Sequence, residues 1–397
     1  MKPSLICTKM MVVAVLGMWV PAGPALATNI TWDFQRVSSQ APSPPMVSLG
    51  MRTGDTWPTV FYNRAGFTAA SLTPVGWSET ALGTSADNLV RAARARDGSD
   101  GRVGIAWLNG GREVLFAQSS RYGWQASKVG TAVTSSSVSG PDFAYTSDDR
   151  PVVTYTGLSG NKAGLVVSAY DGLGWNTDLV DKVTVSQTVR IGGDLPTIAV
   201  DSQDRIGLGF RSNSEVIFAT KDLAQGSWYG TSLGSTFPSS SSMMLSLGYG
   251  ANDHVAMAIK SNNLLWVSHF DIQSGAWVTE QLSVAVASQA VNLAFDSQGH
   301  PAVAFSGSDD VIHYMVNRGD GWTDVVLPLG TDPTSGLVVN PVVGTDAALA
   351  FDRFDNPVIA YVGSAGLILA YDPVVTPEPA SLLMGLFGLV VLCARRR

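Results

Sequence analysis

The sequence predicts an all-β protein, a seven-bladed β-propeller made of four-stranded antiparallel blades. Three observations lead to this fold class: a four-strand unit that recurs along the chain, a tryptophan that marks each unit at regular spacing, and a strand near the N-terminus that has no blade of its own. A lone sheet with two apolar faces cannot bury both of them. The repeats must therefore stack on one another to form a core.

The repeating unit is clearest in residues 291–328, VNLAFDSQGHPAVAFSGSDDVIHYMVNRGDGWTDVVLP. Four short runs, rich in β-branched and aromatic residues, alternate with stretches of Gly, Ser, Asn and Asp. Such runs predict short strands joined by tight turns. Seven copies of the second strand are visible, at residues 59–62, 103–107, 151–155, 206–210, 255–259, 301–305 and 357–361.

One tryptophan stands near the start of the last strand of each unit, and neighbouring copies are 45 to 53 residues apart. This spacing suits four short strands with their turns, as in a propeller blade. The seven copies are Trp32, Trp77, Trp124, Trp175, Trp228, Trp277 and Trp322.

The N-terminal strand is expected to close the ring. The last unit ends after its third strand and has no tryptophan of its own, whereas Ile30 to Phe34 reads as a last strand with no blade before it. We expect it to pair with Leu367 to Tyr371, because closure removes exposed sheet edges. An open solenoid is the alternative, but it leaves Trp32 without a role.

The N-terminal residues 1–27 have the pattern of a secretory signal peptide. Lys2 and Lys9 precede or flank an apolar run from Met10 to Val20, and a small-x-small motif ends at Ala27. Signal peptidase is expected to cleave between Ala27 and Thr28. The propeller is then expected to span residues 28–373.

The C-terminal residues combine a linker, an apolar run and a basic cluster. Residues 374–379 form the linker, and residues 380–397 hold fifteen apolar or small residues followed by three arginines. Fifteen residues make about 22 Å of helix, a short single transmembrane helix with its arginines on the cytoplasmic side. An ordinary membrane anchor is one interpretation.

The order Pro-Glu-Pro, apolar helix and terminal arginines closely resembles the PEP-CTERM sorting signal. This resemblance implies processing by exosortase, a membrane-embedded protease-transpeptidase of Gram-negative bacteria. It also implies an exported protein that is held transiently in the inner membrane and then released or attached at the cell surface, as in biofilms. The recognition motif would be Pro377, Glu378 and Pro379, and the cytoplasmic stop Arg395, Arg396 and Arg397.

Composition excludes several classes of function. The net charge is −7, and five of the basic residues lie in the terminal segments. Without them 20 basic residues face 32 acidic ones, which argues against nucleic-acid binding. Cys7 and Cys393 also lie in the terminal segments, so the body has no disulfide and no cysteine zinc site.

No catalytic or cofactor motif stands out, and we predict no metal or cofactor. The repeats resemble those of exported bacterial propellers that are grouped with sialidase-like propellers, but Asp-boxes are absent. The histidines lack metal-site spacing, and the turn aspartates are typical of residues that cap their own backbone. These residues are His254, His269, His300 and His313, and Asp201, Asp296 and Asp352.

A basic residue follows or ends the second strand in five successive blades, and the sixth blade carries Asp309 and Asp310 instead. We predict that these basic residues form an arc that binds an anionic group such as an acidic polysaccharide; the alternative is that they are simply solvated. They are Arg64, Arg112, Lys162, Arg211 and Lys260.

Taken together, the sequence favours an exported, non-enzymatic binding module at the cell surface or in the extracellular matrix, with polysaccharide as a candidate ligand. The alternative is a glycosidase or lyase that acts on polysaccharide from a sialidase-like propeller.

Overall fold

The computed structural model describes residue 30 and residues 32–372 with internal gaps. The gaps are 44–46, 52–56, 65, 74, 84–101, 121, 134–139, 160–161, 181, 186–187, 191–193, 222–225, 235–236, 238–242, 289 and 334. The predicted signal peptide and the predicted C-terminal helix therefore lie outside the described residues. Within the described part of the chain, no helix is long and apolar enough to cross a membrane.

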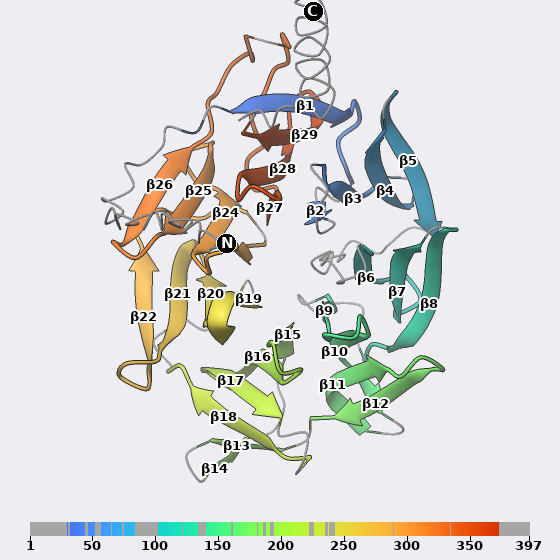
Figure 1. Ribbon diagram of the computed structural model, residues 1–397, viewed down its shortest axis with the longest axis vertical. Helices are drawn as coiled ribbons and strands as arrows, with labels where there is room; N and C mark the ends of the chain where they lie inside the picture. The colour runs from blue at the N-terminus through green and yellow to red at the C-terminus, as the bar shows by residue number, and fades with distance from the viewer. Residues whose placement is uncertain are drawn as a thin grey trace, which may run out of the picture. The chain divides into compact units, whose positions relative to one another are not determined.

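The residues from Trp32 onward form one compact unit of seven sheets, which we number as blades 1 to 7 in chain order (Figure 1). Blade 1 holds β2 (Val47–Gly50), β3 (Thr59–Asn63), β4 (Phe67–Thr73) and β5 (Gly76–Gly83). Blade 2 holds β6 (Gly104–Leu108), β7 (Glu113–Ser120) and β8 (Gly123–Thr131). Blade 3 holds β9 (Asp142–Tyr145), β10 (Pro151–Ser159), β11 (Lys162–Tyr170) and β12 (Trp175–Leu179).

The remaining blades complete the set. Blade 4 holds β15 (Asp194–Val200), β16 (Ile206–Ser212), β17 (Glu215–Lys221) and β18 (Trp228–Ser232). Blade 5 holds β19 (Met244–Tyr249), β20 (Val255–Ser261), β21 (Leu264–Asp271) and β22 (Ala276–Leu282). Blade 6 holds β23 (Asn292–Phe295), β24 (Pro301–Ser306), β25 (Ile312–Asn317) and β26 (Trp322–Val326). Blade 7 holds β27 (Ala347–Phe351), β28 (Pro357–Gly363), β29 (Gly366–Tyr371) and β1 (Asp33–Ser38).

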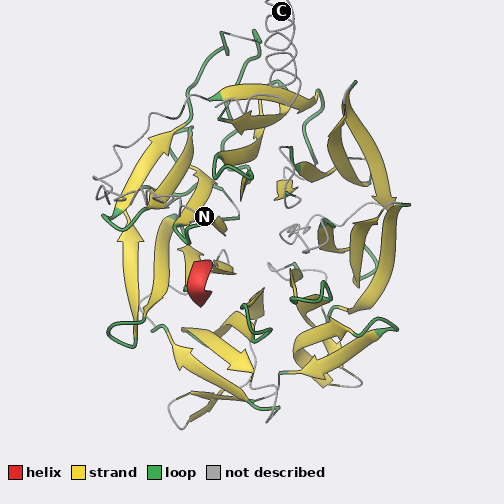
Figure 2. Cartoon of the chain, viewed as in Figure 1, coloured by secondary structure: helices red, strands yellow, loops and turns green. Residues whose placement is uncertain are grey.

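The predicted seven-bladed propeller is confirmed, with one addition. Neighbouring strands within each blade are antiparallel, and Figure 2 shows strands in every blade and one short 3₁₀ helix, Ala251–Asp253. A hairpin of β13 (Val183–Val185) and β14 (Thr188–Arg190) joins the outer edge of blade 4, where β13 runs parallel to β18. The sequence repeat gives no signal for this hairpin, because among the described residues no other blade has a copy.

Burial follows the strand's place in its blade. The second strands β20, β24 and β28 are buried along their whole length, which explains why their sequences are almost wholly apolar. The outermost strands β5 and β26 are mostly exposed or half-buried. Each blade therefore buries both of its inner faces against its two neighbours.

The N-terminal strand closes the ring, as predicted. β1 pairs antiparallel with β29, with Asp33 opposite Tyr371 and Phe34 opposite Ala370. The strand starts three residues later and ends four residues later than the predicted Ile30 to Phe34, because Asp33 already pairs with Tyr371, the last residue of β29. Trp32 packs edge-on against Tyr314 of blade 6, with ring centroids 6.2 Å apart.

The marker tryptophans lie between blades. Each packs into the apolar cluster that its own blade shares with the preceding one. Two direct ring contacts illustrate this: Trp124 of blade 2 meets Phe61 of blade 1, and Trp175 of blade 3 meets Phe116 of blade 2. The clusters also take in Trp77, Trp228, Trp277 and Trp322. The regular spacing in the sequence thus records one packing contact repeated around the ring.

Candidate functional site

The turns that join the first and second strands of a blade share one construction. The Asp201 carboxylate accepts hydrogen bonds from the backbone N–H groups of Gln203 and Arg205, at 2.9 and 2.8 Å. Asp296 and Asp352 do the same in blades 6 and 7. The predicted structural role of these three aspartates is confirmed, since each one caps its own turn.

The fourth residue of these turns links one blade to the next. Asp253 of blade 5 accepts hydrogen bonds from the N–H and the hydroxyl of Ser202 in blade 4, at 2.8 and 2.9 Å. The same pairs of bonds join Asp204 to Ser147 and Asp355 to Ser297. We call each pair an Asp–Ser latch, and the side of the ring that carries these turns the latch face.

The interface between blades 5 and 6 lacks this latch. Gly299 stands where the other turns have the latch aspartate, and Ala251 stands where they have the serine. An added Cβ on Gly299 would lie 3.0 Å from the Ala251 backbone nitrogen, so the two turns touch without a carboxylate or hydroxyl between them. Of the four interfaces whose two turns are both described, this one alone has no latch.

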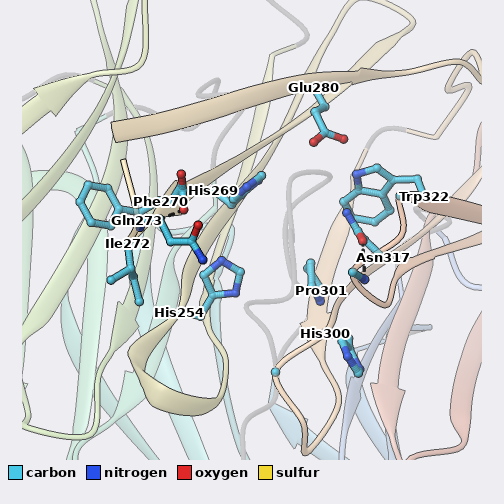
Figure 3. Close-up of a pocket in the computed structure, with 14 residues that line it drawn as sticks. His254, His269, Phe270, Ile272, Gln273, Glu280, His300, Pro301, Asn317 and Trp322 are labelled. Carbon is cyan, nitrogen blue, oxygen red and sulfur yellow. Dashed lines mark hydrogen bonds between the residues drawn. The ribbon is translucent and has the colours of Figure 1, made fainter. Parts of the chain in front are cut away.

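A pocket of about 540 Å³ opens at this unlatched interface. Figure 3 shows His254, His269, Phe270 and Gln273 on the blade 5 side, and His300, Pro301, Asn317 and Trp322 on the blade 6 side. Glu280 reaches toward the space between them from β22. The other lining residues are Asp271, Ile272, Gly299, Gly319 and Gly321. Its volume is typical of small-molecule sites.

Trp322 forms the aromatic wall of the pocket. It opens β26 and pairs with Asn317 at the end of β25, and it packs against the apolar cluster shared by blades 5 and 6. Its position is therefore fixed by packing, while part of the side chain faces the pocket. A planar aromatic face next to carboxylate, amide and imidazole groups gives the pocket one apolar wall and several polar groups.

Two imidazoles share the blade 5 wall. The rings of His254 and His269 are 5.8 Å apart and nearly perpendicular. Burial, followed by the neighbouring His269, lowers the pKa of His254 below the ordinary histidine value, against the smaller effects of a hydrogen bond to the backbone of Gly299 and of the Asp271 charge. His254 is therefore neutral at pH 7. Its ring N–H donates to the Gly299 backbone, so its other ring nitrogen is left as an acceptor.

The carboxylate of Asp271 is occupied by its own turn. It accepts hydrogen bonds from the N–H groups of Gln273 and Ser274. The Ser274 side chain, followed by these N–H groups, holds the Asp271 pKa below the usual range. A glycosidase acid needs a carboxyl whose pKa is raised. Asp271 thus suits hydrogen bonding to a hydroxyl group better than proton donation to a leaving oxygen.

Metal binding finds no support in the described part of the chain. His254, His269 and His300 all line the pocket, yet no group of three histidine, cysteine, aspartate or glutamate side chains among the described residues could hold a metal ion. The Nδ1 atom of His300 is already 2.7 Å from the Asp296 carboxylate. We therefore treat the imidazoles as hydrogen-bonding groups.

The five basic residues of the predicted arc lie on five different blades. The Arg64 guanidinium pairs with Glu79 at 3.0 Å, and Arg211 binds Asp194 through two hydrogen bonds of 2.9 and 2.6 Å. Each of these charges is therefore neutralised within its own blade.

The other three basic residues differ in exposure. Lys260 is only 5 % exposed, whereas Arg112 and Lys162 are exposed. The Arg112 guanidinium also donates to the backbone oxygen of Val133, at 3.2 Å. All five lie toward the hairpins between second and third strands, at the opposite end of the strands from the latch face. They do not contribute to the pocket, and their role in binding stays a prediction.

The residues predicted for processing lie outside the described residues. These are Ala27 and Thr28 at the expected cleavage site, and Pro377, Glu378, Pro379, Arg395, Arg396 and Arg397 in the sorting motif.

The pocket was not predicted from the sequence. Trp322 was identified only as a marker of the repeat, and the histidines were set aside for lack of metal-site spacing. The signal that could have found the pocket is the loss of Ser and Asp at two aligned turn positions, Ala251 and Gly299.

No protein-family model matches the chain, and no curated protein matches it. Among solved structures, the fucose-specific lectin of Aleuria aurantia matches with 14 % identity over 73 % of this chain and 96 % of that chain, with a TM-score of 0.47. AofleA from Arthrobotrys oligospora matches with 10 % identity over 77 % and 91 %, with a TM-score of 0.48. Matches at these identities and TM-scores decide neither the ligand nor the activity of this chain.

Proposed function

We propose that this protein is a non-enzymatic glycan-binding propeller whose ligand occupies the pocket between blades 5 and 6. The observation that carries the proposal is the coincidence of the missing latch with that pocket. Where Asp and Ser join neighbouring turns, two hydrogen bonds close the interface between the blades. Where Gly299 and Ala251 replace them, the seam holds a lined pocket.

The lining suits a hydroxyl-rich sugar ring. The C–H face of a sugar can lie against the Trp322 indole, while its hydroxyls bond to polar groups at the edge. Glu280, Gln273 and Asn317 supply such groups from both blades. Because Glu280 and Asp271 are acidic and His254 is neutral at pH 7, this pocket favours neutral sugars over anionic ones.

Acidic polysaccharide remains the ligand proposed for the basic hairpins rather than for the pocket. Arg112 and Lys162 are the exposed members of that set, and they lie at the other end of the strands. The two ligand classes can therefore be separated by mutation, since Arg112→Ala leaves the pocket intact.

A glycan-array screen of the purified chain tests the proposal. We expect binding to neutral glycans, and a loss of about tenfold or more in affinity for Trp322→Ala, because the aromatic wall is removed. Trp175→Ala is the matched control: it is the equivalent tryptophan of blade 3, also packed between blades. Equal losses in both variants, or no glycan bound by the wild type, would contradict the proposal.

Export and sorting by a PEP-CTERM system are also part of the proposal. The supporting observations are the sequence patterns of residues 1–27 and 377–397, with signal peptidase and exosortase as the processing partners. Mass spectrometry of the protein from its own cells should find Thr28 at the N-terminus and no peptide from residues 380–397. An intact C-terminus would identify an ordinary membrane anchor instead.

A further inference from the structure

The outermost hairpins of four blades end in large apolar side chains that face solvent. These hairpins join the third and fourth strands, and the tip residues are Val75, Tyr122, Leu173 and Ile272. They are 97 %, 79 %, 96 % and 70 % exposed. We call these four residues the apolar tips. Single exposed apolar residues are common, but a set placed at the same position of blades 1, 2, 3 and 5 forms an extended feature.

The apolar tips lie on the latch face. In an antiparallel blade, the hairpin between third and fourth strands shares its side with the turn between first and second strands. In blade 5 the register confirms this: His269, next to the β21–β22 hairpin, pairs with Ala256, next to the turn before β20. The four tips therefore face the same way as the turns that carry the latches.

The chain also leaves the propeller on the latch face. The last strand, β29, ends at Tyr371, which pairs with Val358 beside the turn at 352–356. That turn holds the Asp355 latch to Ser297. The apolar run that begins at Ala380 follows Tyr371 by only nine residues, which can span at most about 30 Å when fully extended.

We propose that the latch face docks on a lipid bilayer, with the apolar tips inserted at the interface, for as long as the C-terminal apolar segment is part of the chain and holds it there. Several exposed apolar side chains on one face, including an amphipathic tyrosine, fit the boundary between headgroups and acyl chains. The hairpins on this face also carry the exposed Asp171 and Asp320, whereas Asp148 is paired with Arg150 at 2.7 Å, so the surface suits zwitterionic lipid better than anionic lipid. The proposal does not rest on glycan binding; because Ile272 also lines the pocket, docking would place the mouth of the pocket at the lipid interface.

The test compares two leucines of blade 3 in the full chain reconstituted into vesicles of phosphatidylcholine and phosphatidylethanolamine. Leu173 is an apolar tip, and Leu158 is exposed near the β10–β11 hairpin at the other end of the strands. Cys7 and Cys393 are replaced by serine. A polarity-sensitive fluorophore is then attached through Leu173→Cys or Leu158→Cys, and lipids that carry a spin label serve as quenchers.

We expect a blue-shifted emission and about twofold stronger quenching for the probe at position 173, because a docked tip lies at the depth of the acyl-chain boundary. A third variant, Tyr122→Cys, should behave like Leu173→Cys. Water-like emission at positions 173 and 122, with quenching no stronger than at position 158, would overturn the proposal. A blue-shifted emission at position 173 without quenching by the spin-labelled lipids would also overturn the proposal. That result would identify a protein partner or a second copy as the occupant of this face.

Discussion

Asp253 and Ser202 join blades 5 and 4 through two hydrogen bonds to one carboxylate, 2.8 Å from the serine N–H and 2.9 Å from its hydroxyl. The backbone hydrogen bond is the largest cause that lowers the Asp253 pKa, so the aspartate is ionised at neutral pH. Hydrogen bonds to a charged group are stronger than neutral ones. A ring of blades held mainly by apolar packing thus gains a polar connection at each latched seam.

The first prediction concerns that connection. Asp253→Ala should lower the free energy of unfolding by about 1 kcal/mol, because the latch bonds are lost at a partly exposed site. The measurement is the urea unfolding midpoint. Asp320→Ala is the control, since Asp320 lies on the same face in the exposed β25–β26 hairpin. An equal shift in both variants would show that general surface charge, and not the latch, is responsible.

The second prediction inserts the missing latch. Ala251→Ser combined with Gly299→Asp should restore the two bonds seen at the neighbouring seams. The latch aspartates have φ near that of Gly299, 57° to 64° against 87°, so the backbone accepts the change. The added Cβ is tight against Ala251, and Gly299→Asp alone should therefore destabilise.

A double-mutant cycle measures the coupling between these two positions, which we expect to be favourable by about 1 kcal/mol. The same double variant should bind the pocket's ligand more weakly, because the new side chains lie at its edge. A coupling energy near zero would contradict the view that a latch was lost here.

The fold could be predicted because every blade repeats the same packing contact. Trp124 and Trp175 occupy equivalent positions against Phe61 and Phe116, so the repeat appears directly as a tryptophan spacing. The closing strand was predicted for the same reason, since Trp32 had no blade before it. Both of its ends differ, since β1 runs from Asp33 to Ser38 and not from Ile30 to Phe34.

The pocket could not be predicted from motifs because it coincides with the absence of a serine and an aspartate from two turns in different blades. Ala251 and Gly299 are ordinary turn residues when each is considered alone. Their importance is evident only from the neighbouring interface, where Ser202 and Asp253 at the equivalent positions are hydrogen-bonded to each other. Two members of the predicted basic arc, Arg64 and Arg211, form ion pairs within their own blades, and the sequence does not show such pairing.

The third prediction concerns ring closure. Trp32→Ala should lower the free energy of unfolding by about 3 kcal/mol, because a largely buried indole is removed from its contact with Tyr314. The N-terminal strand should then detach more often and be cut by protease ahead of the other blades. Trp124→Ala is the matched control, since that blade is covalently continuous. It should cost similar stability without early cleavage near β1.

The last prediction uses His313, which lies between two carboxylates in blade 6. Its Nδ1 atom is 2.9 Å from Asp324 and its Nε2 atom 3.0 Å from Asp309, and the ring stacks on Phe305. Burial by itself lowers the His313 pKa, but the hydrogen bonds and charges of Asp324 and Asp309 outweigh it, so the pKa is raised above 6.5. Asp309, which interrupts the basic series of the other blades, thus pairs with this histidine.

A raised pKa in the folded state stabilises the protein while the imidazole is charged. This contribution is complete below the unfolded value of about 6.5 and is lost as the pH rises through the higher folded value. Urea unfolding of the wild type should therefore show lower stability at about pH 9 than at about pH 6.

In His313→Gln the difference in stability between the two pH values should shrink, because the titrating group is gone. Stability at the lower pH should also fall, because the two carboxylates lose their cation. His300→Gln serves as control, since its partner Asp296 retains the N–H groups of its own turn. An unchanged pH dependence in His313→Gln would show that His313 is not the group responsible.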